Sequence, residues 1–325
     1  MYRTDRFSRV EHAERGPFVF AVIAVMVLGV AISCATGHEK TKEENKTPAP
    51  PPTLGGEIAQ PDHTMQQSGP QTVTFAAAVD AYSKRRYREA AASFEDYTQR
   101  HPASASGHYM LGLSAWKSGD LARARLAFER SLELDSTNVK TLLNLGRVLL
   151  DQGQPGEALV RIGSAAALDS GSAEVQRMMG RVQTARGQRD SAMTSYRTAL
   201  SIDPADSWSM NNLGLLLIDE GRYEEALPPL ARAVELRPEA PAFANNLGVA
   251  LERTGHPSAA ADAFRSALKA DSTYVKATRS LARVEEKAKS DSTVVDVSQL
   301  AATFNQEIQA TRRTDRLAKE PDGDR

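Results

Sequence analysis

Hydrophobic and polar positions in the middle of the chain follow the period of an α-helix. In the segment LLNLGRVLLDQG, the apolar residues Leu142, Leu145 and Leu149 recur at the i, i+3, i+7 spacing of one helix face. Gly153 ends this helix, because glycine adopts the left-handed conformation at little steric cost. The next segment, GEALVRIGSAAALD, has apolar residues at i, i+4 and i+7. The pattern therefore predicts two antiparallel helices joined by a short turn.

Three series of small residues then recur along the chain, each at a spacing of 34 residues and without an insertion. Two series are glycines and one is alanines: Gly112, Gly146, Gly180, Gly214 and Gly248; Gly119, Gly153, Gly187, Gly221 and Gly255; Ala90, Ala124, Ala158, Ala192, Ala226 and Ala260. A period of this length predicts a stack of helix pairs. Small residues at fixed places let the helix backbones approach closely, while larger ones fill the space between them.

These positions resemble the motif of the tetratricopeptide repeat family. That motif has a large residue and Leu-Gly, then a glycine before the turn, then Ala, an aromatic residue, Ala and Pro. The fifth unit shows it as Asn212, Leu213, Gly214, Gly221, Ala226, Leu230, Ala233 and Pro238. Six units match: 71–104, 105–138, 139–172, 173–206, 207–240 and 241–274. The resemblance implies an all-α fold, a right-handed superhelical solenoid of six helix pairs plus a capping helix.

Some units depart from this motif. The first unit has Arg85 where the turn glycine belongs, and a non-glycine residue there costs on the order of 1 kcal/mol. Ser136, Ser170 and Ser272 replace the closing proline, and we expect them to cap the following helices.

The segment after the repeats has two parts. The pattern of apolar and charged positions over residues 275–290 predicts a capping helix whose outer faces are charged, as the end of a repeat stack requires. Within the tail, 291–325, a further helix is predicted over 298–319, with a narrow apolar stripe. This helix either docks on the repeats or stays mobile. A further hypothesis places residues 291–310 in the groove of the repeats.

The amino-terminal residues 1–33 have the form of an export signal. Arginines precede the uncharged run PFVFAVIAVMVLGVAIS, and this run ends at Cys34. Val30 to Cys34 resemble the lipobox of bacterial lipoproteins, in which the signal is cut before the cysteine and the cysteine then carries lipid. Ala31 departs from that pattern, because leucine usually stands there.

Three interpretations of this amino terminus remain open: a lipoprotein anchored through Cys34, an uncleaved membrane anchor, and a plain signal with an incidental cysteine. The first two place the repeats on the exported side, because the arginines hold the preceding end in the cytoplasm. Ala35 after the cysteine suggests outer-membrane sorting by resemblance. We therefore expect a periplasm-facing, lipid-anchored protein of the cell envelope, with an inner-membrane signal anchor as the alternative. Residues 34–70 are rich in proline and polar residues, which predicts a disordered tether.

Composition and charge narrow the choice of function. The 40 basic and 41 acidic residues nearly cancel, which argues against a general nucleic-acid binder. A single cysteine excludes an intramolecular disulfide, and no Cys/His cluster has metal-ligand spacing. No phosphate-binding loop or nucleophile stands out, so we expect no cofactor, no metal and no enzymatic activity.

By resemblance to the family, the first helix of each unit lines a concave groove. Its first zone is aromatic: Phe75, Tyr82, Tyr109 and Trp116. Its second zone is mainly basic: Lys140, Asn144, Arg147, Arg177 and Arg181. Its third zone is rich in amides: Trp208, Asn211, Asn212, Asn245 and Asn246. Arginines bind carboxylates and asparagines bind peptide backbones, so the groove suits an extended, acidic protein segment. The alternative is that the asparagines are structural and that Trp116 simply packs at its turn.

The sequence thus predicts an exported, membrane-tethered scaffold that binds protein partners. By analogy of architecture it resembles lipoproteins of pilus and secretion-complex assembly, and lipoproteins that recruit cell-wall hydrolases. An enzyme or glycan-transfer subunit is the competing class. A structural spacer without a groove ligand is the third.

Overall fold

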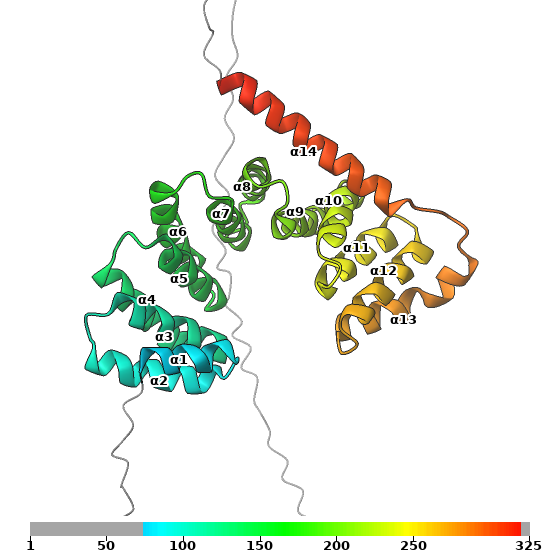
Figure 1. Cartoon of the computed structure of the whole chain (residues 1–325). Helices are drawn as coiled ribbons and strands as arrows, with labels where there is room; N and C mark the ends of the chain where they lie inside the picture. The colour runs from blue at the N-terminus through cyan, green and yellow to red at the C-terminus, as the bar shows by residue number, and fades with distance from the viewer. Residues whose placement is uncertain (1–73, 320–325) are drawn as a thin grey trace, which may run out of the picture. The chain divides into compact units, whose positions relative to one another are not determined.

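The computed structural model describes residues 74–319, which form helices joined by short turns (Figure 1). The expectations for the export signal, Cys34 and the tether concern residues outside this range. No strand occurs between residues 74 and 319.

The helices form pairs that repeat along the chain. The first helices of the pairs are α1 (Phe75–Ser83), α3 (Ala105–Ser118), α5 (Val139–Asp151), α7 (Ala173–Ala185), α9 (Ser207–Asp219) and α11 (Pro241–Arg253). The second helices are α2 (Tyr87–Arg100), α4 (Leu121–Leu134), α6 (Pro155–Leu168), α8 (Arg189–Ile202), α10 (Tyr223–Leu236) and α12 (Pro257–Ala270). Two single helices follow, α13 (Val275–Ser290) and α14 (Val297–Lys319). The structure confirms the predicted all-α solenoid of six helix pairs with a capping helix, α13.

The turn inside each pair depends on a left-handed residue. Gly119, Gly153, Gly187, Gly221 and Gly255 all have positive φ, between 72° and 90°. Arg85 takes this place in the first pair with φ of 59°, the one non-glycine residue with positive φ among those described. The predicted strain at Arg85 is therefore present.

The second glycine series allows close packing inside each pair. A Cβ atom at Gly214 would lie 2.4 Å from Leu230, and one at Gly180 would lie 2.6 Å from Tyr196. Gly112, Gly146 and Gly248 face a large side chain of the second helix in the same way. Each pair thus places one large residue against a position that has no side chain.

The expectation that serines in the closing-proline position cap the next helices was wrong. The caps lie two residues later, where Asn138 accepts from the Thr141 amide and Ser172 from the Val175 amide. A capping residue has non-helical backbone immediately before the first helical residue, and in this fold position 34 of each unit has such a backbone. The helix that follows Ser272 begins after Tyr274 and has no side-chain cap.

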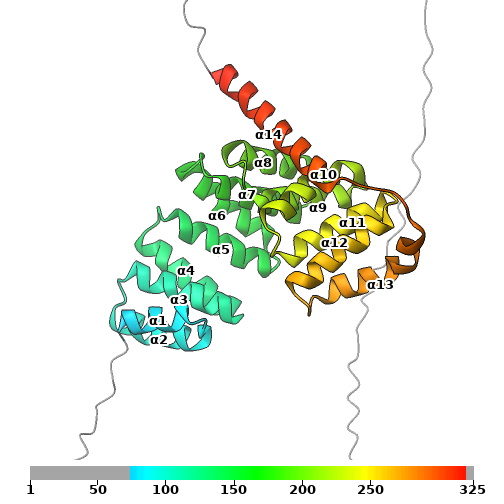
Figure 2. The ribbon, with the colours of Figure 1, turned by 45° about the vertical axis from the view of Figure 1, so that its right-hand side comes forward.

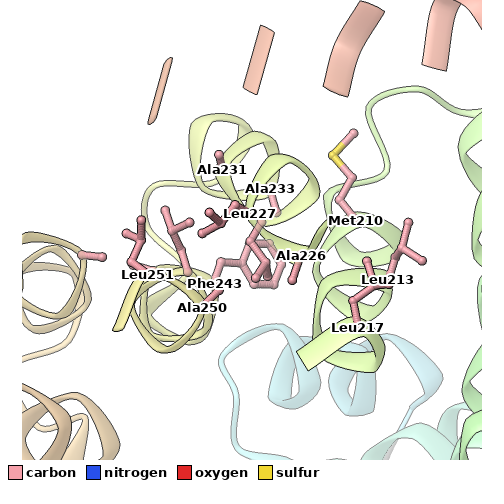
Figure 3. Packing of buried hydrophobic residues seen from close by; sticks show 14 of the residues in the cluster. Met210, Leu213, Leu217, Ala226, Leu227, Ala231, Ala233, Phe243, Ala250 and Leu251 are labelled. Atoms are coloured by element: carbon pink, nitrogen blue, oxygen red, sulfur yellow. The ribbon is translucent and has the colours of Figure 1, made fainter. Parts of the chain in front are cut away.

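Successive units pack mainly by placing the second helix of one unit against the first helix of the next. The backbones of successive first helices also approach each other, whereas those of successive second helices do not within residues 74–319. Successive second helices meet through side chains, as in the 2.9 Å ion pair between Arg125 of α4 and Glu157 of α6. The first helices therefore form the inner, concave side of the stack. The core lies between the two layers, and in Figure 3 apolar side chains of α9, α10 and α11 converge there.

The tail helix α14 lies on the outer layer. It packs along α10 and touches α8, both of them second helices (Figure 2). Ala301, Phe304 and Ile308 form its buried stripe. The hypothesis that residues 291–310 occupy the groove was wrong, because the groove is lined by first helices and α14 binds the opposite side.

Candidate functional site

The candidate site is the inner face formed by the first helices. Residues at the same position of successive units lie next to one another along this face. The three zones expected from the sequence can therefore be followed from α1 to α11, side chain by side chain.

The aromatic zone is largely used for packing. Phe75 makes edge contacts with Phe94 and Tyr97 of α2, and Tyr82 packs edge-on against Tyr87. These contacts fix the first pair, whose other core residues are mostly alanines. Phe75 and Tyr82 thus act mainly in the packing of the first unit rather than as residues free to bind a ligand.

Two further aromatic residues tie the second unit to the third. The Trp116 indole donates a hydrogen bond to Asp151 at 2.8 Å. The hydroxyl of Tyr109 accepts from the Asn144 amide at 3.1 Å, and burial raises the pKa of that phenol. Both bonds join residues 35 positions apart, so they hold neighbouring first helices in register.

Two arginines of the basic zone are neutralised by the protein itself. Arg147 donates to Asn144 at 2.6 Å and forms an ion pair with Glu174. Arg177 forms an ion pair of 2.6 Å with Asp206, whose side chain is almost fully buried. These two pairs link α5 to α7 and α7 to the cap of α9, so neither arginine offers a full positive charge to a ligand.

Arg181 differs from its two neighbours. Among the described residues no carboxylate lies within ion-pair distance of it, and its hydrogen bond goes to the Met178 sulfur at 3.5 Å. Burial lowers the pKa of this guanidinium, and the charges of Arg147 and Arg177 act in the same direction. Lys140, by contrast, is exposed. The basic zone therefore contains one partly buried cation that lacks a counter-ion.

The asparagines of the third zone divide into two groups. The Asn246 amide donates to Asn211 at 2.8 Å, a third link between residues 35 positions apart. Asn245 is buried, and its side-chain oxygen has no hydrogen-bond partner. The Asn212 side chain makes no hydrogen bond to another described residue and is half-buried. Asn212 is thus the amide best placed to bind a ligand.

An apolar stripe on α9 lies beside Asn212. Trp208 is 45% exposed and Leu215 is 36% exposed, although both are large and apolar. With Asn212 they follow the i, i+4, i+7 spacing of one helix face. The Phe243 ring supports Trp208 edge-on, with centroids 4.9 Å apart. Leu215 and Arg181 hold the same position in successive units, so this stripe continues into the unpaired cation.

Three residues that decide the character of this face were not predicted from the sequence. Glu174 and Asp206 were not selected as site residues, although they neutralise two of the arginines. Leu215 was not selected, although its spacing from Trp208 was a signal available in the sequence. Among residues 74–319 no group of side chains has the composition of a metal site. None of the helices in that range has the length and apolarity needed to cross a membrane.

Comparison with known families gives continuous matches along the repeats. Family models described as tetratricopeptide repeat match residues 75–139 and 211–275, 115–182, and 164–239. Together these matches span residues 75–275 without a gap, which is more than half of the chain. A search of curated protein sequences found no significant match.

Solved structures with the same fold come from several sources. A chain of the APC/C hetero-tetramer Cut9–Hcn1 matches with a TM-score of 0.57 and 17% identity, over 64% of this chain and 41% of that chain. A tetratricopeptide repeat protein from Parabacteroides merdae ATCC 43184 matches with a TM-score of 0.57 and 12% identity, over 65% and 82%. A thermophilic TPR protein from Thermus thermophilus matches with a TM-score of 0.51 and 18% identity, over 56% of this chain and 100% of that chain. At these identities the likeness shows the fold alone.

Proposed function

Because the chain belongs to the tetratricopeptide repeat family, we propose that it is a non-enzymatic scaffold that binds an extended protein segment on its inner face. The observation that carries this proposal is the unpaired Arg181 at the end of the stripe formed by Trp208, Asn212 and Leu215. A cation, an amide and two exposed apolar side chains lie in a row. That combination suits a peptide better than a small molecule, because its groups are spread along the helices rather than gathered in a pocket.

The proposed ligand is an extended segment with one carboxylate and a neighbouring apolar residue. The carboxylate would bind the Arg181 guanidinium, and a charge-assisted hydrogen bond of this kind contributes about 1.5–3 kcal/mol. Trp208 would anchor the apolar residue, since large aromatic side chains commonly dominate binding energy. The Asn212 amide would donate to and accept from the peptide backbone.

A peptide-display selection tests this proposal and does not require the partner to be identified first. The wild-type repeats should enrich peptides with an acidic residue close to an apolar one. Arg181→Gln should lose the acidic preference, and Trp208→Ala the apolar one. Arg161→Gln, on the second helix α6, is the matched control and should select the same peptides as wild type. Enrichment of the same acidic peptides by Arg181→Gln would refute the assignment of this cation.

We also propose that the scaffold works in the cell envelope. Cys34 at the end of an apolar run supports a lipid-anchored protein of the cell envelope, with residues 35–70 as the tether. An inner-membrane signal anchor is the alternative. In this placement the scaffold serves an envelope assembly, of the pilus or secretion kind, or recruits a cell-wall hydrolase. Labelled palmitate should enter the wild-type protein and not Cys34→Ser, and equal labelling of the two would exclude lipidation at this residue.

A further inference from the structure

A second candidate site lies on the outer side of the stack, beneath the tail helix. A cleft of about 410 Å³ is enclosed by α8, α9, α10 and α14. The helix α14 crosses above α10 in both Figure 1 and Figure 2. This volume lies within the usual range of small-molecule sites, about 300–1,000 Å³.

The cleft has an apolar interior. Leu200, Leu213 and Leu217 form its floor and are almost fully buried, and Phe304 and Ile308 of α14 reach in from above. These side chains leave the space unfilled. An apolar space that the protein does not fill costs packing energy, and an apolar ligand of suitable size recovers it.

One wall of the cleft is a stretch of helix that contains two prolines. Pro228 and Pro229 lie inside α10 and line the cleft. Proline has no N–H, so the carbonyl groups of Glu224 and Glu225 lack the partner that a regular helix supplies four residues later. This wall therefore carries two backbone acceptors without their usual donor.

The mouth of the cleft is acidic. The Glu225 carboxylate is bound by Arg222 at 2.6 Å, which lowers the pKa of Glu225, and Arg197 contributes more weakly in the same direction. Glu224 of α10 and Glu307 of α14 also line the cleft, and neither has an ion-pair partner among the described residues. Arg197 of α8 is the one cation of this lining, and it too forms no ion pair within residues 74–319. Three carboxylates and one guanidinium thus border the apolar space.

We propose that this cleft binds a small amphipathic amine, with its apolar body beneath α14 and its ammonium group between Glu224 and Glu307. The amine is favoured over an acid because the cleft is lined by three carboxylates and by a single guanidinium, that of Arg197, so its charged lining is net negative. Such a ligand touches both α10 and α14. Binding therefore strengthens the docking of the tail helix on the repeats.

Titration calorimetry with decylammonium, kept below its micelle concentration, tests this site in the intact protein. The amine should bind, and decanoate, which has the same length and opposite charge, should bind at least about tenfold more weakly. Glu224→Gln combined with Glu307→Gln should weaken the binding of the amine by a similar factor. Ser201→Trp, which fills the cleft, should abolish binding. Glu285→Gln on the exposed surface of α13 is the control and should bind like wild type.

Hydrogen exchange provides a second measurement that does not depend on the heat of binding. Decylammonium should slow amide exchange in α14 relative to α3, which lies far from the cleft along the chain. Equal binding of decanoate, unchanged affinity in the double Gln variant, or exchange in α14 that the amine does not slow would each overturn the proposal. Peptide selection on the inner face is independent of these results, so the two sites succeed or fail separately.

Discussion

At the scale of the residue, glycine acts in this fold in two different ways. The glycines inside the first helices are needed for space, since a Cβ atom at Gly214 would overlap Leu230 of the second helix. The glycines at the turns are needed for backbone conformation, and a Cβ atom at those positions meets nothing within 4 Å. Substitutions at the two kinds of position should therefore fail for different reasons.

The packing glycines can be tested by adding a methyl group. Gly214→Ala should lower the free energy of unfolding by about 1–3 kcal/mol, because overpacking displaces Leu230. Gly163→Ala in α6 is the matched control. A Cβ atom there meets no atom within 4 Å, so the change should raise stability by up to about 1 kcal/mol through helix propensity. Urea unfolding measures both. A stabilised Gly214→Ala protein would contradict the close approach of α9 and α10.

Arg85 allows the opposite test at a turn. Its φ of 59° is strained for a residue with a side chain. Arg85→Gly should raise the free energy of unfolding by up to about 1 kcal/mol. The substitution relieves the backbone strain, and the extra conformational entropy that glycine gives the unfolded chain offsets part of this gain. Arg88→Gly, inside α2, should instead lower it by a similar amount. The urea midpoints of the two variants should therefore move in opposite directions from wild type.

At the scale of the element, buried ion pairs join one helix to the next. Asp206 caps α9 by accepting from Ser209, and it also binds Arg177 of α7 at 2.6 Å. Asp206→Ala should lower the free energy of unfolding by about 3 kcal/mol, because it leaves a largely buried arginine without its partner. Asp120, which caps α4 at an exposed position, is the control, and its change to alanine should cost about 1 kcal/mol. Equal losses in urea unfolding would show that the ion pair contributes nothing beyond the cap.

The linker before α14 should respond to acid. Asp291 accepts a hydrogen bond from the Ser258 amide at the start of α12, and this bond lowers the pKa of Asp291 below its ordinary 3.8. A carboxyl with a lowered pKa contributes stability above its unfolded value of 3.8, and loses it as pH falls through the lower folded value. Asp291→Ala should thus have a lower urea midpoint than wild type at pH 7. The difference should shrink below pH 3.8 and disappear in stronger acid, whereas Ser292→Ala should match wild type throughout.

The sequence allowed much of the fold to be predicted and less of the site. A 34-residue period with Gly214 and Gly221 in register leaves few alternatives to stacked helix pairs, because each glycine meets a specific local requirement. The partners of Arg147 and Arg177 could not be predicted, since they lie on other helices and depend on how neighbouring units rotate against each other. The apolar stripe of α14 predicted a helix, but it left open whether the helix docks on the repeats and on which side. Both layers of the stack offer apolar surface, so the docking face follows from three-dimensional packing.

At the scale of the whole molecule, the core is unevenly distributed along the stack. The cluster that includes α9, α10 and α11 contains many large side chains, whereas that of the first pair is mostly alanine. In a solenoid each unit is stabilised mainly by its neighbours, and the first unit has a neighbour on one side among the described residues. The first pair should therefore open most easily.

Amide hydrogen exchange tests this gradient in the intact protein. Amides in α1 and α2 should exchange well before those in α9 and α11, because smaller buried surfaces give lower local opening energies. Arg85→Gly should slow exchange in α1 and α2 and leave α11 unchanged. Exchange at one common rate throughout residues 74–319 would mean that the stack opens as a single unit.

The position of α14 also has a mechanical consequence. A solenoid behaves as a spring, because the backbones of successive second helices are not packed together and their separation changes when the stack is stretched or bent. In this protein α14 bridges α8 and α10 on the side where that separation would open. It acts as a brace across α8 and α10, whereas within residues 74–319 no further helix spans α2, α4 and α6, which are linked by surface ion pairs such as Arg125–Glu157. Under tension, extension should begin in the unbraced coils, and the segment around Arg181 and Trp208 should keep its spacing longest.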